Sequence, residues 1–74
     1  MKRDEAFDKQ LGQIIKSERE KTGLTLEQVA NKMGISKQAV SHYETGIRQM
    51  WASTLRDYCK AVGINMNDVF DKIK

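Results

Sequence analysis

The sequence predicts an all-α fold, a compact bundle of five helices. Three observations support this prediction. The 74 residues contain no proline, no run of alternating β-branched residues suggests a strand, and apolar residues recur at helical spacing between well-separated glycines. Four of the five glycines stand where a helix should stop. A chain of this length is one domain at most, so residues 1–74 are expected to form a single domain.

The first helix is expected to begin after Asp4, whose carboxylate can cap it, and to end before Gly23. Its apolar positions have helical spacing and are Phe7, Leu11, Ile14 and Ile15. Gly12 lies inside this helix, where glycine costs up to about 1 kcal/mol relative to alanine. We therefore expect another backbone to approach the helix closely at Gly12.

Thr25 opens a second helix with a capping box, because Gln28 three residues later can return a hydrogen bond to the cap. The expected buried stripe of this helix consists of Leu26, Val29, Ala30 and Met33. Gly34 can adopt the left-handed conformation that reverses the chain in a tight turn.

A third helix is capped by Ser36 and runs to about Glu44, before Gly46 stops it. Its inward-facing residues are Ala39, Val40 and Tyr43. The residues that point away from the core are Lys37, Gln38, Ser41 and His42. The second and third helices are thus joined by a glycine turn, and the later one presents a polar face.

Residues 45–51 form a loop with a basic half and then an apolar half. A fourth helix follows and ends at Gly63, with one apolar face made by Leu55, Tyr58, Cys59 and Val62. Asn65 can cap a short fifth helix that runs from Met66 to about Lys72.

The composition and the absence of certain motifs exclude several classes of function. The single cysteine, Cys59, excludes an intramolecular disulfide and a cysteine-based zinc site, and we interpret it as a small buried hydrophobe. No apolar run approaches the roughly 20 residues that span a bilayer, and no signal peptide precedes the first helix. We expect a cytoplasmic, nucleoid-associated protein without membrane contact. No carboxylate pair, activated nucleophile or phosphate loop stands out, so we expect neither an enzyme nor a cofactor.

The segment from Leu24 to Gly46 carries a family resemblance, with matching positions at Gln28, Ala30, Gly34, Ile35, Val40, Glu44 and Gly46. Further on, KAVGINMNDVF stands where the family places its closing helix. The chain resembles the phage repressor and Cro type of regulator, also called Xre-like, over a core of residues 11–70. The resemblance implies a helix-turn-helix at residues 25–45 and a sequence-specific, double-stranded DNA-binding transcriptional regulator, with repression as the expected mode.

Base contacts are expected from the third helix, because a major groove about 12 Å wide admits one helix. The candidate base-contacting residues are Ser36, Lys37, Gln38, Ser41 and His42. Gln38 can bond to adenine at two atoms, and Lys37 can donate to the acceptor edge of guanine. The resemblance implies that positions 37, 38 and 42 are the main base readers. Because His42 is the only histidine and no second ligand stands near it, a metal site is not expected.

Phosphate contacts are expected at the start of the second helix, where Gln28 and unpaired amide groups point outward. The loop after the third helix adds Arg48 and Gln49. The resemblance further implies that Arg19 and Glu44 form a structural ion pair, which would fix the third helix against the first.

Met50, Trp51 and Ala52 depart from the family pattern, which often has a proline, a small capping residue and an apolar residue there. Trp51 is either a lid over the core or an anchor in a dimer contact. Ser53 is an alternative cap for the fourth helix.

A homodimer on a two-fold operator is expected, because one module contacts too few base pairs for useful specificity. The expected dimer surface combines the loop with the fifth helix and consists of Met50, Trp51, Ile64, Met66, Phe70 and Ile73. The alternative function is a protein-interaction module, such as an antitoxin or adaptor. No small-molecule ligand is evident in the sequence.

Overall fold

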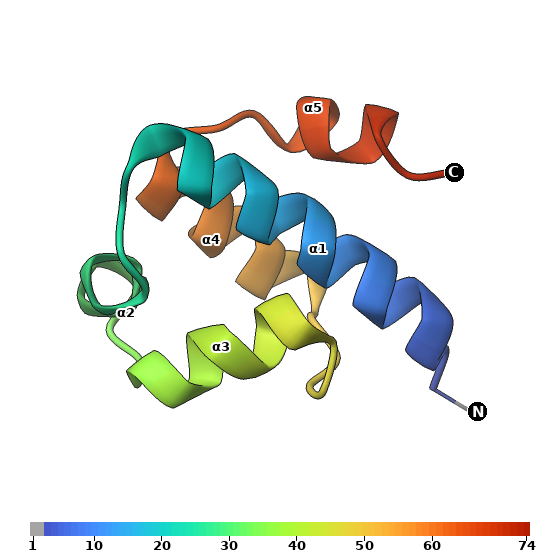
Figure 1. Cartoon of the computed structure of the whole chain (residues 1–74), viewed down its shortest axis with the longest axis horizontal. Coiled ribbons are helices and arrows are strands. Elements are labelled where there is room, and N and C mark those ends of the chain that lie inside the picture. Colours follow the sequence, from blue (N-terminus) through green and yellow to red (C-terminus); the bar gives the residue numbers. More distant parts are fainter. Residues whose placement is uncertain (1–2) are drawn as a thin grey trace.

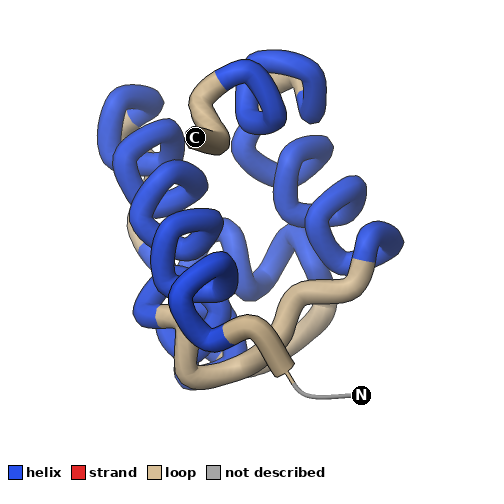
Figure 2. The backbone as a smooth tube through the Cα atoms, turned by 90° about the vertical axis from the view of Figure 1, so that its right-hand side faces the viewer, coloured by secondary structure: helices blue, strands red, loops and turns tan. Residues whose placement is uncertain are grey.

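The computed structural model describes residues 3–74, so Met1 and Lys2 of the predicted domain lie outside the described residues. The five helices are α1 (Glu5–Thr22), α2 (Leu26–Met33), α3 (Lys37–Thr45), α4 (Ala52–Val62) and α5 (Met66–Asp71). Figure 2 shows only helices and loops along the described chain. The predicted all-α fold of five helices is confirmed.

Local side-chain caps set the helix starts, as predicted at four of them. Asp4 accepts a hydrogen bond from the Phe7 amide at 3.0 Å, Ser36 caps α3 in the same way, and Asn65 caps α5 by accepting from the Asn67 amide at 2.8 Å. At α2 the Thr25 hydroxyl accepts from the Gln28 amide at 3.1 Å, while the Gln28 side chain accepts from the Thr25 amide at 2.9 Å. This reciprocal pair is the predicted capping box.

Helices α1 to α4 each end at a glycine with positive φ, the conformation that other residues adopt at a cost. Gly12 is different, because it lies within α1 and packs against another helix. A Cβ atom at this position would lie 2.5 Å from the carbonyl oxygen of Glu44 and 2.6 Å from that of Tyr43. The close backbone approach expected at Gly12 is therefore confirmed, and it brings α1 directly onto the last turn of α3.

One hydrophobic core receives side chains from all five helices. Its fully buried members include Ile15, Val29, Val40, Tyr58 and Val69. In Figure 1, α1 crosses the molecule diagonally, with α3 below it, α5 above it and α2 seen end-on at one side. Cys59 is buried, as interpreted from the sequence, and burial raises the pKa of its thiol. None of the helices in the described chain is long and apolar enough to cross a membrane.

The start of α4 corrects two of the interpretations made from the sequence. Trp51 is 70% exposed, so it is not a lid over the core. It occupies the N-cap position itself and makes no side-chain capping bond, which means that Ser53 is not the cap. The apolar row of α1 also extends beyond the core at one end, since Phe7 is exposed. Helical spacing identifies an apolar row but does not show where the core stops covering it.

Candidate functional site

The outer face of α3 is polar and continuous. Val40 and Glu44 are buried on the inner side of this helix, while Ala39 and Tyr43 are half-buried. The opposite arc consists of Lys37, Gln38, Ser41, His42 and Thr45, of which only Ser41 is half-buried. Four of the five predicted base-contacting residues therefore lie on this one face, which we call the α3 polar face. The fifth, Ser36, precedes the helix, and its hydroxyl accepts from the Ala39 amide at 3.0 Å.

Thr45 is a further member of the α3 polar face and was not among the residues predicted from the sequence. Its hydroxyl donates to the carbonyl of Ser41 at 2.9 Å, so the side chain lies back along the helix. The spacing of four residues from Ser41 and three from His42 could have identified it.

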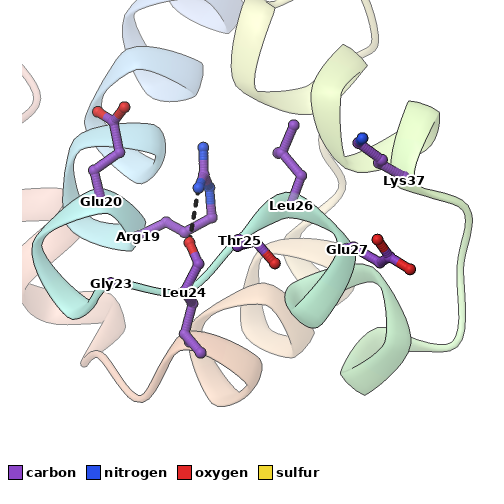
Figure 3. Close-up of a pocket in the computed structure, with 8 residues that line it drawn as sticks. All are labelled: Arg19, Glu20, Gly23, Leu24, Thr25, Leu26, Glu27 and Lys37. Atoms are coloured by element: carbon purple, nitrogen blue, oxygen red, sulfur yellow. Dashed lines mark hydrogen bonds between the residues drawn. The ribbon is translucent and has the colours of Figure 1, made fainter.

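A hollow lies beside the start of α3, where the end of α1 and the start of α2 meet it. Figure 3 shows Arg19 of α1 and Lys37 of α3 on the two sides of Leu26. The carboxylates of Glu20 and Glu27 stand at the edge of the same hollow. Because Arg19 is engaged in an ion pair, Lys37 is the cation of this hollow that is available to an anion.

The capping box reduces the number of donors that the start of α2 can offer to a phosphate. It takes the Gln28 amide and the Gln28 side-chain carbonyl, leaving the side-chain NH2 group as a donor. The amides of Leu26 and Glu27 stand in the first turn, where no intrahelical acceptor exists. An anion at this site would be attracted by these donors and by Lys37. The negative charges of Glu20 and Glu27 at the edge of the hollow would repel it.

The loop after α3 holds Arg48 beside the helix. Its guanidinium lies 5.7 Å from the centroid of the Tyr43 ring, a distance suited to a cation–π contact. The Arg48 amide also donates to the carbonyl of His42 at 3.2 Å. Gln49, the other predicted loop contact, is exposed. The loop thus presents one cation held against Tyr43 and one exposed amide at the end of α3.

The expected pair of Arg19 and Glu44 is present and bidentate. Arg19 Nε lies 2.7 Å from Glu44 Oε2, and Nη2 lies 3.0 Å from Oε1. The remaining nitrogen, Nη1, donates to the Leu24 carbonyl at 2.8 Å, just before α2. Both side chains are buried, and the hydrogen bonds to Glu44 raise the pKa of Arg19. A single guanidinium therefore joins α1, α3 and the approach to α2.

Tyr58 of α4 also belongs to this network. The sequence did not reveal this role, because Tyr58 also fits the apolar row of its helix. Its hydroxyl lies 2.6 Å from Glu44 Oε2 and 3.0 Å from the Ile15 carbonyl oxygen. Burial, reinforced by the contact with Glu44, raises the pKa of Tyr58, so the phenol keeps its proton. The orientation of α3 is therefore fixed by α1 on one side and by α4 on another.

Arg3 makes a second unexpected tie between α1 and α3. Its Nε lies 2.6 Å from the buried carboxylate of Asp8, and its Nη2 donates to the Gly46 carbonyl. At the same place the Lys9 main chain packs on Gly46, where a Cβ atom would lie 2.7 Å from the Lys9 Cα. These contacts hold the end of α3 against the start of α1.

The residues predicted for a dimer surface lie in two groups, with Met50 and Trp51 in the loop before α4 and the rest in and around α5. Trp51 and Phe70 are exposed, at 70% and 49%. The other four, partly buried and packed against the core, are Met50, Ile64, Met66 and Ile73. In Figure 1 the loop that leads into α4 lies below α1, whereas α5 lies above it. The segment that ends at Trp51 and the helix that holds Phe70 therefore lie in separate parts of the molecule.

The fold and the site together define a helix-turn-helix protein, in which α2 and α3 meet at Gly34 and α3 presents the polar face. Residues 10–69 match the sequence model of a family described as "Helix-turn-helix domain", and the chain belongs to this family.

Solved structures agree with this assignment. Two crystal structures of the clp gene regulator ClgR from Corynebacterium glutamicum are similar to this chain, each with 27% sequence identity over 90% of it. The alignments cover 87% and 71% of the ClgR chains, with TM-scores of 0.87 and 0.86. No curated protein sequence matches the chain.

Proposed function

We propose that this protein is a sequence-specific, double-stranded DNA-binding transcriptional regulator that places α3 in the major groove. The observation that carries the proposal is the α3 polar face, a continuous row of hydrogen-bonding side chains on a helix held rigidly from behind. A rigid helix presents its donors and acceptors to base edges at little entropic cost. Membership of the helix-turn-helix family and similarity to a gene regulator support the same function.

Within this function, Lys37, Gln38 and His42 are the base readers, and Ser36 and Ser41 lie next to them at the groove. Gln28, the first amides of α2, Arg48 and Gln49 contact phosphates on either side. Phosphate contacts supply most of the affinity and set the register, while base contacts select the sequence.

Selection of bound sequences from a random duplex pool tests the proposal. We expect a two-fold symmetric sequence with half-sites about one helical turn apart. Gln38→Ala should relax the preference at one position of each half-site, at a cost of about 1 to 3 kcal/mol in discrimination. Asn67→Ala, on the exposed side of α5, is the matched control and should leave the selected sequence unchanged. A pool without enrichment would contradict sequence-specific binding.

The proposal includes a homodimer that represses by occupying a promoter. The exposed indole of Trp51 is the anchor that we assign to the dimer contact, since a large exposed aromatic side chain is typical of interface centres. Sedimentation equilibrium should show a dimer, and Trp51→Ala should weaken it. A monomer at high concentration would remove the dimer from the proposal without affecting DNA binding by one module.

A protein-interaction module is the second candidate function, and the apolar side chains of the loop favour it. Ile47 is 63% exposed and lies four residues before Trp51. Salt titration separates the two candidates, because each phosphate contact steepens the dependence of duplex affinity on salt. Weak duplex binding without such dependence would favour the interaction module.

A further inference from the structure

We propose that α1 carries a row of DNA-backbone contacts, formed by Lys9 and Lys16 along the flank of α3. This inference rests on the proposed function and extends it to α1, a helix for which the sequence predicts no DNA contact. The ligand is the phosphodiester backbone of duplex DNA.

The geometry comes from a hollow between α1 and the end of α3. It is lined by Lys9, Gln13, Lys16, Glu44 and Thr45. The three α1 residues stand three and four positions apart, so they share one face of the helix. Because Thr45 belongs to the α3 polar face, the two lysines lie beside the surface that we place in the groove.

The relative position of the two helices is fixed at this flank. The backbone at Gly12 leaves no room for a Cβ atom against the carbonyl groups of Tyr43 and Glu44. At the other end of the row, the Lys9 main chain packs on Gly46. The lysine row therefore cannot move away from α3 while the fold is intact, and only the side-chain stems are flexible.

The two ammonium groups are available to an anion. Among the described residues, the α1 side chains that form ion pairs are those of Asp8, Glu18, Arg19 and Lys21. Neither Lys9 nor Lys16 forms one. Glu44, the carboxylate that lines the hollow, is already bonded to Arg19 and to the Tyr58 hydroxyl. Glu5 and Glu20 stand one turn from the lysines on the same helix and are exposed.

A major groove has a sugar-phosphate backbone along each wall, so a helix inserted into it lies between two rows of negative charge. The hollow at the start of α3 contains Lys37 and Glu20, and the hollow at its end contains Lys9, Lys16 and Thr45. Each hollow is lined by residues of both α1 and α3, one at the start of α3 and the other at its end. Lysine is a compact charge on a flexible stem and suits successive phosphates along one strand.

The double variant Lys9→Gln/Lys16→Gln tests the inference. It is titrated at several salt concentrations with the duplex that the wild-type protein enriches from a random pool. The slope of log affinity against log salt should become shallower by about 0.9 for each phosphate that a lysine no longer neutralises. The enriched sequence should not change, because phosphate contacts do not read bases. Ethylation of phosphates along one wall should cease to interfere with binding by the variant.

Two further variants serve as controls. Lys60→Gln/Lys74→Gln makes the same change in charge at two exposed lysines that do not line the hollow, one in α4 and one after α5. It should keep the steeper slope, as should Lys9→Arg/Lys16→Arg, which preserves both charges. Far-UV circular dichroism checks that each variant is folded, and the single variant Lys16→Gln replaces the double one if Lys9→Gln disturbs the contact with Gly46.

The outcomes separate the inference from the proposed function. If the test and control double variants have the same slope, the α1 row makes no phosphate contact and the inference is wrong, while DNA binding by α3 stands. If the wild-type protein binds no duplex, the proposed function fails, and the inference fails with it.

Discussion

Gly12 is the single residue on which the contact between α1 and α3 most depends. Its lack of a side chain lets the carbonyl groups at the end of α3 approach the α1 backbone. The atoms that would meet a new Cβ belong to the main chain, which cannot rotate away as a side chain can. Gly12 therefore determines how closely α1 packs against α3, the helix that carries the polar face.

Gly12→Ala is expected to destabilise the protein, although alanine is the better helix former. The gain in helix propensity is at most about 1 kcal/mol, whereas overpacking against backbone costs about 1 to 3 kcal/mol. Equilibrium urea unfolding measures the balance. Ser17→Ala, on the exposed side of the same helix, should be neutral or slightly stabilising. A Gly12→Ala protein as stable as the wild type would show that the two helices can separate at little cost.

Among the helices formed by residues 3–74, α4 is the one that begins without a side-chain cap. Trp51 has φ −73° and ψ 157°, nearly the values of −76° and 153° at Ser36, which does cap α3. The backbone at the start of α4 is therefore already in the geometry that a capping serine needs.

Trp51→Ser should make the protein more stable than Trp51→Ala by about 0.5 to 2 kcal/mol, because both remove the indole but only serine supplies a cap. Unfolding by urea at one fixed oligomeric state measures the difference. Equal stability of the two variants would mean that the serine hydroxyl does not reach the first-turn amides. Comparison with the wild type in sedimentation experiments tests the role of the indole in the dimer separately.

Helix α5 is tied to α1 through Glu18, which lies 2.8 Å from the Lys72 ammonium and 2.9 Å from that of Lys21. Lys72 first, and then Lys21, lower the pKa of Glu18 below its ordinary value of 4.5. Since the folded-state pKa is the lower one, ionised Glu18 stabilises the fold above about pH 4.5. This contribution disappears as the pH falls through the lowered pKa.

Glu18→Gln should therefore cause a small loss of unfolding free energy at neutral pH, and no loss in strong acid, where both proteins are uncharged at this position. Urea unfolding over a series of pH values follows the difference. Glu20→Gln, at the exposed neighbouring carboxylate, should give a smaller difference. A difference for Glu18→Gln that does not change with pH would contradict the assigned cause.

At the scale of the whole molecule, the buried network of Arg19, Glu44 and Tyr58 connects three helices. Each member comes from a different one, α1, α3 or α4, and Arg19 also reaches the segment before α2. In the described chain no buried side-chain nitrogen or oxygen is left without a hydrogen-bond partner. Loss of one member would leave the others buried and unsatisfied.

Glu44→Ala is expected to cost about 3 to 5 kcal/mol, because Arg19 would become an unpaired buried charge. In a domain of this size such a loss lowers the melting temperature by at least about 10 °C. Thermal unfolding followed by circular dichroism measures it, with Glu20→Ala as the exposed control. Unchanged melting would mean that the network does not stabilise the fold, and any loss of DNA binding would then be a direct effect.

Much of the architecture could be predicted from residues close together in the sequence. Thr25 and Gln28 form their capping box within one turn, and Gly34 ends α2 through its own backbone conformation. The α3 polar face follows from helical spacing alone. The pairing of Arg19 with Glu44 was expected from the family resemblance, since no local pattern joins two residues 25 positions apart.

Sequence alone was enough to establish the fold class, the ends of most helices and four of the five side chains on the α3 polar face, because each depends on interactions within about one helical turn. The packed structure was needed to show that Tyr58 bonds to Glu44, that Trp51 is exposed and that Lys9 and Lys16 lie beside Thr45. These facts depend on how separate helices cross, and that is set by the packing of the whole core.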